Sequence, residues 1–561
     1  NRVLDGRINC NTAMVDLAER SIQRMPLLVA AFAEKMPTPT LEISQEIIVS
    51  AECLAKGEVL ESLPESSELS KTVSQVEASE PEPEGPFVFG QGAIPTTTWY
   101  HYPGTVGSPG AIDATDAAAV AAANITQNLT DGSTPFFAQG TYYGTGYDTF
   151  EPTIGVTGSG AIFFTNWNGL GDGTHIIRSR DQGQTWEDVG PFVGGGDGGS
   201  GQTQNSNDPY IYVDKFTDRL VKFDMHALAV INVEYSNNDG ETWSTPFPTH
   251  GYAVPQDHQS IASMPHPNAI VGDVVYVYCI NTGSPAAGAQ CSRSLDGGHT
   301  WDAQQFGYPT ESFGNQCSGL HGHVAGGSDG SIYRGNPSCE GPAVYASHDG
   351  GYTWSEHTIT TEVGMQQGWH SHEVAVAIDE GGNVHATWIS TDEMPWYAYS
   401  RDQGVTWSQP MMVAAPGVSE TGFPTIFAGD EGRVVVGYIG EVNDCNGGGN
   451  NTTQENSSTC GWGGYMAVMT DAFADNPLIT SVVVNMPEDA LDITSDCGNV
   501  RCGGFGDFID VELDDEGRPW IALAHNAADT QEAVIGTLMT GPALYGELVQ
   551  LPDLPAGGFS T

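Results

Sequence analysis

Short apolar and aromatic stretches, separated by polar turns, fill the chain from about residue 149 to residue 545. Each unit has a short strand, a D-x-x-G or similar turn and an aromatic-rich strand, as in 208–213 followed by 220–223. Seven such units can be counted. About four strands in every ~50–55 residues, repeated, is typical of propeller blades. We predict an all-β fold, a seven-bladed β-propeller, with six or eight blades as alternatives.

An eight-residue pattern, Ser-x-Asp-x-Gly-x-Thr-Trp, supports this periodicity. It begins at residues 179, 294, 347 and 400, and a fifth copy at 236 has Asn238 in the aspartate position. We interpret each copy as a hairpin turn: Asp accepts turn hydrogen bonds, Gly supplies positive φ, and Trp packs between sheets. The pattern therefore predicts structural, non-catalytic roles for its aspartates, which are Asp181, Asp296, Asp349 and Asp402.

The first 90 residues differ in composition from the rest. They are rich in Glu and poor in Gly, and 12–33 and 41–55 mix apolar and polar positions as helices do. The run Glu80-Pro-Glu-Pro-Glu-Gly-Pro86 is an extended, charged linker. We predict a small helical N-terminal segment (1–90), an irregular lead-in (91–148) with ring closure as one option, the propeller (149–545), and a tail (546–561).

Charge and cysteine content narrow the class of protein. The chain has 70 Asp and Glu against 18 Lys and Arg, a net charge of −52. A nucleic-acid binder needs clustered basic residues, and a membrane span needs about 18 or more apolar residues in a row, so we expect neither. Such an acidic surface fits a protein that works in high salt or at low pH, or an ordinary secreted acidic protein.

Four local cysteine pairs without CxxC spacing favour disulfides and a secreted, extracellular protein; they are 279/291, 317/339, 445/460 and 497/502.

The five copies of the eight-residue pattern, called boxes below, resemble the Asp-box (bacterial neuraminidase, BNR) repeats of sialidases and their relatives. The resemblance covers residues 149–545. More narrowly, 151–156, 257–259, 317–323 and 507–511 are similar to secreted bacterial and archaeal sialidase-like proteins. The resemblance implies an Asp-box propeller that meets glycans. True sialidases also hold the substrate carboxylate with three arginines, the bidentate donors suited to it. Here that triad is missing, which argues against true sialidase activity, and only Arg334 and Arg501 lack a turn position, so both are candidate substrate-binding residues.

Candidate chemistry lies where the first, innermost strand of each blade begins. His321-x-His323 and His370-x-His372 occupy equivalent places in successive blades, and residues i and i+2 of a strand face the same side. Three interpretations stay open: a metal site formed by these four histidines, a proton-transfer group, or structural packing. The candidate catalytic residues are His321, His323, His370, His372, Asp257, His258, Glu373, Asp208 and Asp507.

We expect a secreted, sialidase-like propeller that acts on or binds a glycan or glycoconjugate. A glycoside hydrolase with paired carboxylates is favoured. The alternatives are a non-catalytic carbohydrate-binding, protein-binding or adhesion propeller, with residues 1–90 as the contact to a surface partner, and a polysaccharide lyase with a histidine base. The cofactor is unknown; a divalent metal, either calcium or a histidine-bound transition metal, is an option.

Overall fold

The computed structural model describes residues 97–113, 138–166, 175–191, 209–226, 228–250, 255–282, 288–309, 321–366, 371, 373–441, 462–485, 490–491, 506–527, 530–546, 551 and 554. The chain divides into two units, 1–87 and 88–561, and all described residues belong to the second. The helices predicted within 1–90 lie outside the described residues. No helix among the described residues is long and apolar enough to cross a membrane.

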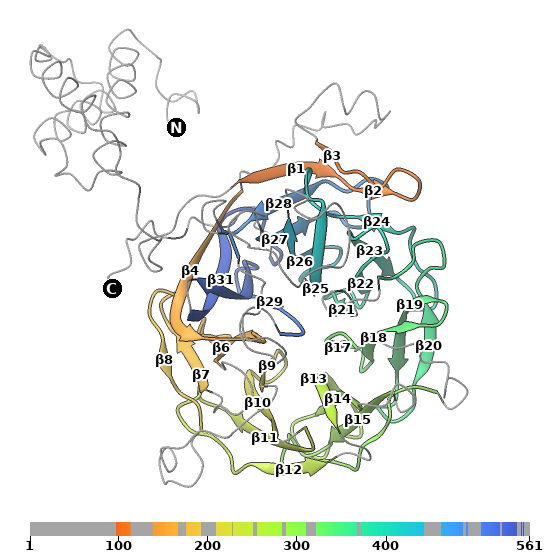
Figure 1. Ribbon diagram of the computed structural model, residues 1–561. Helices are drawn as coiled ribbons and strands as arrows, with labels where there is room; N and C mark the ends of the chain where they lie inside the picture. Colours follow the sequence, from red (N-terminus) through yellow and green to blue (C-terminus); the bar gives the residue numbers. More distant parts are fainter. Residues whose placement is uncertain are drawn as a thin grey trace, which may run out of the picture. The chain divides into compact units, whose positions relative to one another are not determined.

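Seven antiparallel sheets form a ring, with the first strand of each sheet nearest the axis (Figure 1). Blade 1 comprises β5 (Ile154–Val156), β6 (Ile162–Asn166), β7 (His175–Ser179) and β8 (Glu187–Asp188). Blade 2 comprises β9 (Pro209–Asp214), β10 (Arg219–His226), β11 (Val230–Ser236) and β12 (Phe247–His250). Blade 3 comprises β13 (Gln256–Pro265), β14 (Val274–Thr282), β15 (Ala289–Ser294) and β16 (Gln305–Phe306). Blade 4 comprises β17 (Val324–Gly326), β18 (Ile332–Ser338), β19 (Gly341–Ser347) and β20 (Ser355–Thr358).

The last three blades recruit strands from the beginning of the described chain. Blade 5 comprises β21 (Val374–Ile378), β22 (Val384–Ile389), β23 (Pro395–Ser400) and β24 (Met411–Met412), extended by β2 (Gly104–Thr105). Blade 6 comprises β25 (Glu420–Ala428), β26 (Val434–Glu441), β27 (Gly463–Met469) and β28 (Ile479–Val483), extended by β1 (Thr98–Tyr102) and β3 (Ile112–Asp113). Blade 7 comprises β29 (Asp510–Leu513), β30 (Pro519–Ala527), β31 (Thr530–Thr540) and β4 (Gln139–Asp148). The predicted seven-bladed, all-β fold is confirmed.

The ring closes within blade 7. Strand β4 precedes blade 1 in the chain, yet it pairs antiparallel with β31, with Tyr142 opposite Gly536. Because the outermost strand of the last blade comes from before the first blade, separating blades 7 and 1 would break this backbone ladder. A propeller closed in this way leaves only short sheet edges.

Apolar side chains fill the spaces between neighbouring blades. Tyr333 and Val344 of blade 4, for example, belong to one buried cluster with Val376 and Trp388 of blade 5. Inner strands are therefore buried on both faces; all six residues of β22 are buried. Burial on both faces explains why these strands are continuous apolar stretches in the sequence and do not alternate strictly between apolar and polar residues.

The Ser-x-Asp-x-Gly-x-Thr-Trp turns are held by their own side chains. In the first copy, the Asp181 carboxylate accepts hydrogen bonds from the Thr185 backbone N–H (2.8 Å) and the Thr185 hydroxyl (2.6 Å). The Gly183 N–H donates to Ser179 Oγ at 2.8 Å, and Gly183 has φ 82°. The same bonds occur around Asp296, Asp349 and Asp402, and Asn238 Oδ1 accepts the corresponding Thr242 N–H.

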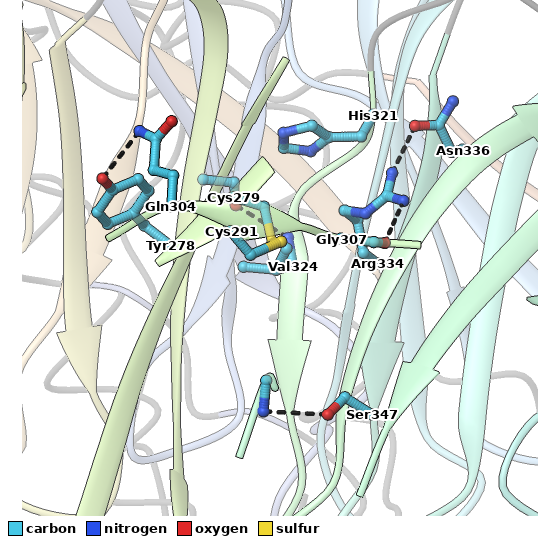
Figure 2. The surroundings of a disulfide bond; sticks show 12 residues. Tyr278, Cys279, Cys291, Gln304, Gly307, His321, Val324, Arg334, Asn336 and Ser347 are labelled. Carbon is cyan, nitrogen blue, oxygen red and sulfur yellow. Dashed lines mark hydrogen bonds between the residues drawn. A yellow bond between two sulfur atoms is a disulfide. The ribbon is translucent and has the colours of Figure 1, made fainter. Parts of the chain in front are cut away.

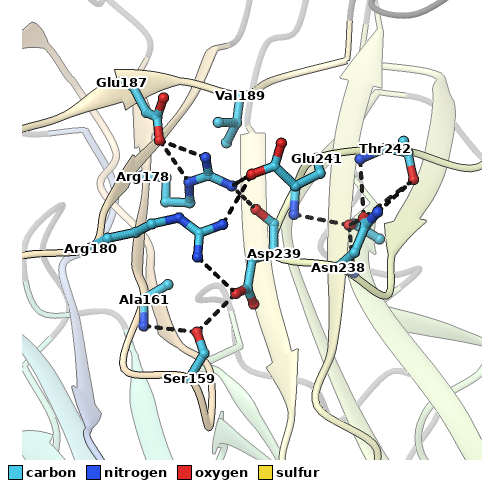
Figure 3. A network of polar contacts seen from close by, with 12 residues as sticks. Ser159, Ala161, Arg178, Arg180, Glu187, Val189, Asn238, Asp239, Glu241 and Thr242 are labelled. Carbon is cyan, nitrogen blue, oxygen red and sulfur yellow. Dashed lines mark hydrogen bonds and ion pairs between the residues drawn. The ribbon is translucent and has the colours of Figure 1, made fainter.

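Arginines connect these turns from blade to blade. Arg178 of blade 1 is only 4% exposed and binds Glu187 of its own blade, Glu241 (2.9 Å) and the Asp239 carbonyl, both in the box of blade 2 (Figure 3). Arg219 of blade 2 donates to the Gly297 carbonyl in the box of blade 3. Arg293 of blade 3 stacks on Tyr352 in the box of blade 4, 4.8 Å from the ring centroid. Three successive blade junctions thus use an arginine.

Replacing Arg178 tests the contribution of this junction. We expect Arg178→Met to lower the free energy of unfolding by about 1.5–3 kcal/mol, because several hydrogen bonds between charged groups are lost at a buried position. Arg180 binds the same Asp239 and Glu241 but is 47% exposed, so Arg180→Met should cost less than about 1 kcal/mol. Urea unfolding of both variants checks this. Equal losses in the two variants would contradict a special role for the buried guanidinium.

Candidate functional site

The innermost strands of all seven blades line one cavity of about 710 Å³. This volume lies in the range of ligand pockets, about 300–1,000 Å³. His323, Tyr210 and Asp510 lie where their strands begin, and Lys215 and Asp515 lie in turns beyond the ends of theirs. A ligand in this cavity would therefore contact residues from several blades.

Several of the predicted site residues converge around one end of the cavity. His258 of blade 3 forms an ion pair with Glu373 of blade 5. The His258 ring lies 5.7 Å from the His321 ring and 5.1 Å from the Phe508 ring, and Phe508 lies 5.3 Å from the His323 ring. Asp507, next to Phe508 in the chain, connects this group of residues to blade 1, because its backbone N–H donates a hydrogen bond to Glu151 Oε1 at 3.1 Å. Blades 1, 3, 4, 5 and 7 therefore meet here.

His258 reaches this position because of an irregularity in β13. The pairing of β13 with β14 shifts register between Asp257 and Ser260, and His258 has φ 61°. Such a bulge re-aims a side chain, and a non-glycine residue at positive φ is strained by about 1–3 kcal/mol. Asp257, just before the bulge, is half-buried.

The environment of His258 favours its charged form. Burial opposes protonation, but the Glu373 carboxylate, together with Asp507 and Asp257, raises the pKa of His258 to about 9. A fully buried imidazolium held by a carboxylate is a fixed positive charge, here next to the His321 ring.

His321 has the opposite character. Its Nδ1 lies 2.7 Å from the Gly322 carbonyl, so Nδ1 carries the proton and Nε2 is an acceptor. Burial, together with the charges of Arg334 and His258, holds the pKa of His321 well below its usual range. We predict from the sequence that His321 and His323 face the same side, because residues i and i+2 of a strand do so. Both residues precede β17, which begins at Val324, so this rule does not apply to them. His321 is fully buried, whereas the His323 side chain is 13% exposed.

His323 and Asp510 form the pair that lines the cavity itself. His323 Nδ1 lies 3.2 Å from Asp510 Oδ1. The Asp510 carboxylate also accepts the backbone N–H groups of Val511 (3.0 Å) and Ile154 (3.1 Å). With the proton on Nδ1, His323 Nε2 is an acceptor atom that is itself buried and has no hydrogen-bond partner among the described residues.

Glu512 lies two residues after Asp510 on β29 and lines the same cavity. Residues i and i+2 of a strand share a face, so both carboxyl groups belong to one side of β29. Burial, together with the Asp510 charge, raises the pKa of Glu512 well above its usual range. One strand face thus presents a carboxylate that accepts backbone hydrogen bonds and a second carboxyl group whose pKa is raised.

Arg334 does not reach the cavity. Its side chain is fully buried, and its guanidinium donates to Asn336 Oδ1 (2.5 Å) and to the Gly307 carbonyl (2.8 Å), as Figure 2 shows. It also stacks on Tyr345, 4.4 Å from the ring centroid. The Cys279–Cys291 disulfide lies beside this arginine in the same figure. The structure therefore places Arg334 in the packing between blades 3 and 4, outside the residues that line the cavity.

The remaining predicted site residues, Asp208, His370, His372 and Arg501, lie outside the described residues. The four-histidine metal site is therefore not described as a set. Within the described ranges, no group of three or more His, Cys, Asp or Glu side chains is arranged to hold a metal ion.

Sequence reasoning did not include Glu512, Phe508 or Tyr210 among the candidate site residues. The alternation Asp510-Val511-Glu512 within a strand-forming segment was the available signal for the carboxyl pair. Phe508 and Tyr210 read as core aromatics, and both are indeed buried.

No family model and no curated protein matches the chain. Similar solved structures include the NanB sialidase from Streptococcus pneumoniae (11% identity, TM-score 0.37, covering 72% of this chain and 70% of that one). The polysaccharide lyase Uly1 is 12% identical (TM-score 0.40, covering 80% and 99%), and the BP39L lectin from Burkholderia pseudomallei is 10% identical (TM-score 0.40, covering 70% and 96%). At these values the likeness carries no argument about activity.

The charge of His258 can be tested directly. We expect its ring to stay protonated at pH 7.5 and to titrate near pH 9, because Glu373 stabilises the imidazolium. In Glu373→Gln the burial remains without the charge, so the pKa should fall below 6.5. Histidine NMR titration measures the pKa of His258 in both proteins, with exposed His299 as an internal control.

Because the pKa of His258 is raised in the folded protein, its ion pair with Glu373 stabilises the fold below about pH 6.5. This contribution is lost as the pH rises through about 9. Unchanged titration in the variant would contradict the assignment.

Proposed function

We propose that this propeller is a glycoside hydrolase that cleaves its substrate in the central cavity. The observation that supports it most is the Asp510 and Glu512 pair. Two carboxyl groups on one strand face, of which Glu512 has a raised pKa, resemble the carboxyl pair that acid–base hydrolysis of a glycosidic bond uses.

Glu512 would act as the general acid. Its half-buried carboxyl group, whose pKa is raised, would give a proton to the glycosidic oxygen as the bond to the anomeric carbon breaks. His323 Nε2 would take a proton from the attacking water, and Asp510 would stabilise the resulting imidazolium through Nδ1. The water oxygen bonds to the anomeric carbon, and return of the proton from His323 to Glu512 restores the starting state.

With His323 as the base, water is the nucleophile. Direct attack by water on the anomeric carbon inverts its configuration, whereas attack by a carboxylate would retain it in two steps. We therefore propose inversion at the anomeric carbon.

One observation favours a second candidate, β-elimination of a uronate-containing polysaccharide. The Tyr210 ring lies 5.3 Å from the His323 ring, and burial and Asp510 raise the pKa of Tyr210 well above its usual value. A protonated tyrosine beside a histidine base could serve as acid and base. Elimination also needs a cation for the uronate, and the basic residues among the described cavity lining, Lys215 and His323, are both paired with carboxylates.

Leaving-group chemistry tests the hydrolase directly. The wild-type protein should release reducing ends from one member of an oligosaccharide panel, and Glu512→Gln should lower kcat about 10²–10⁴-fold. On the dinitrophenyl glycoside of the same sugar, whose leaving group needs no proton, Glu512→Gln should retain near wild-type turnover, whereas Asp510→Asn should not.

Glu516→Gln is the matched control. Glu516 lies in the turn after β29 with its side chain 55% exposed, and its replacement should change neither rate. Binding of a glycan without cleavage by the wild-type protein would reject the hydrolase in favour of a carbohydrate-binding propeller. Equal loss by Glu512→Gln on both substrates would reject Glu512 as the acid.

A further inference from the structure

We propose that Lys222 and Asp224 of blade 2 form an intramolecular amide bond, an isopeptide, with Glu234 transferring the proton. The chain would make this covalent modification by itself, once, after folding. None of the three residues lines the central cavity, so the modification is independent of the proposed function.

The three side chains lie on one face of two neighbouring strands. Lys222 and Asp224 are two residues apart on β10, and Glu234 of β11 lies directly opposite Lys222. Residues i and i+2 of a strand share a face, as do residues directly opposite one another. Leu220, on the same face of β10, belongs to a buried cluster with apolar residues of blade 1. The fold therefore brings an amine and two carboxyl groups together in the interior between blades 1 and 2.

Lys222 contacts both carboxyl groups away from water. Its Nζ forms an ion pair with Asp224 and lies 3.3 Å from Glu234 Oε2. The side chains of Lys222 and Asp224 are 0% exposed, and that of Glu234 is 5% exposed. The amine nitrogen is thus held against the Asp224 carboxyl group, as reacting groups must be for an intramolecular step.

The charges of this group do not cancel. One ammonium group faces two carboxylates, and the second oxygen of Asp224, Oδ1, has no hydrogen-bond partner among the described residues. Removing charges from water costs free energy, which an ion pair recovers only when its remaining hydrogen bonds are satisfied. Condensation of Lys222 with Asp224 removes two of the three charges, and Glu234 can accept the N–H of the new amide.

The step balances without an external reagent. Glu234 takes a proton from the Lys222 ammonium group, and Nζ then attacks Asp224 Cγ to form the C–N bond. Glu234 passes this proton to one oxygen on Cγ, and Nζ gives up a second proton to the same oxygen. The C–O bond breaks and this oxygen leaves as water, so the products are a neutral amide, one water molecule and the Glu234 carboxylate.

The environment suits Glu234 as the proton carrier. Burial raises the pKa of Glu234 against the opposing charge of Lys222. Burial also favours the neutral amine of Lys222, whereas Asp224 and Glu234 favour the ammonium form and raise the pKa of Lys222. Because the reaction takes place only once in each molecule, a small neutral fraction of Lys222 is sufficient.

Mass spectrometry of the full-length protein, after reduction, denaturation and tryptic digestion, tests the proposal. Trypsin cleaves after Lys and Arg, and Lys222 is the one such residue within 220–292. A free Lys222 is cleaved, so the segment from Leu220 to Arg293 gives two peptides. We expect a single 220–293 peptide, lighter than its sequence mass by one water molecule, with the loss placed by fragmentation on the link between Lys222 and Asp224.

Lys215 is an internal control in the same digest. It also forms an ion pair, with Glu380 at 3.3 Å, but its side chain is 32% exposed. Water competes for such an exposed pair, so we expect complete cleavage after Lys215.

Variants assign the roles. Asp224→Asn should form the same amide with loss of ammonia, so its 220–293 peptide should have the wild-type mass. Glu234→Gln keeps the size of the side chain but cannot carry the proton, so Lys222 should be cleaved. Lys222→Arg keeps the positive charge without the amine and should show the full sequence mass. Circular dichroism checks that each variant folds, and the mass of the wild-type protein decides the proposal even where a variant does not.

Three results would contradict the proposal. Complete cleavage after Lys222 in the wild-type protein, with no loss of water, would show that the group remains an ion pair. A bond from Lys222 to Glu234 would overturn the assignment of Asp224 as the acceptor. An unchanged amide in Glu234→Gln would overturn the role of Glu234.

Discussion

The structure depends on joining seven sheets whose innermost strands, as far as the structure describes them, form no backbone ladder with one another. Side chains provide the connection, each accepting a backbone N–H from a neighbouring blade. Thr153 Oγ1 accepts from Ile211 (2.9 Å), Ser260 Oγ accepts from Val324 (2.9 Å), and Asp510 Oδ2 accepts from Ile154 (3.1 Å). Because these bonds lie on the innermost strands, polar residues that hold the ring together also lie beside the cavity.

The use of arginine follows from the same need. In a chain with 18 Lys and Arg against 70 Asp and Glu, the guanidinium groups of Arg178, Arg219 and Arg293 are placed at blade junctions. Arg334 is buried between blades 3 and 4. These arginines neutralise and bridge the outer turns, and the cavity lining keeps an excess of carboxylates. The cavity lining is acidic because most of these arginines are used at the blade junctions and do not line the cavity.

Sequence reasoning predicted the fold because its signals are local and repeated. The Asp181-type turn depends on residues four positions apart, so its hydrogen bonds are encoded within one octapeptide. Proximity of His258 to Glu373 could be anticipated only in outline, since both precede or begin inner strands. The bulge that gives His258 φ 61° depends on pairing with β14, which no short pattern reveals. The burial of Arg334 likewise depends on Gly307, which lies in the previous blade.

Asp510 shows why such a site is difficult to separate from the fold. One carboxylate oxygen accepts the Ile154 N–H and so links blade 7 to blade 1, beside the β4–β31 closure. The other oxygen faces His323 of blade 4, which lies across the cavity. The orientation of His323 is therefore fixed only when the ring is closed, because its partner is held by the closing junction. A propeller opened at blade 7 would lose the position of His323 together with its stability.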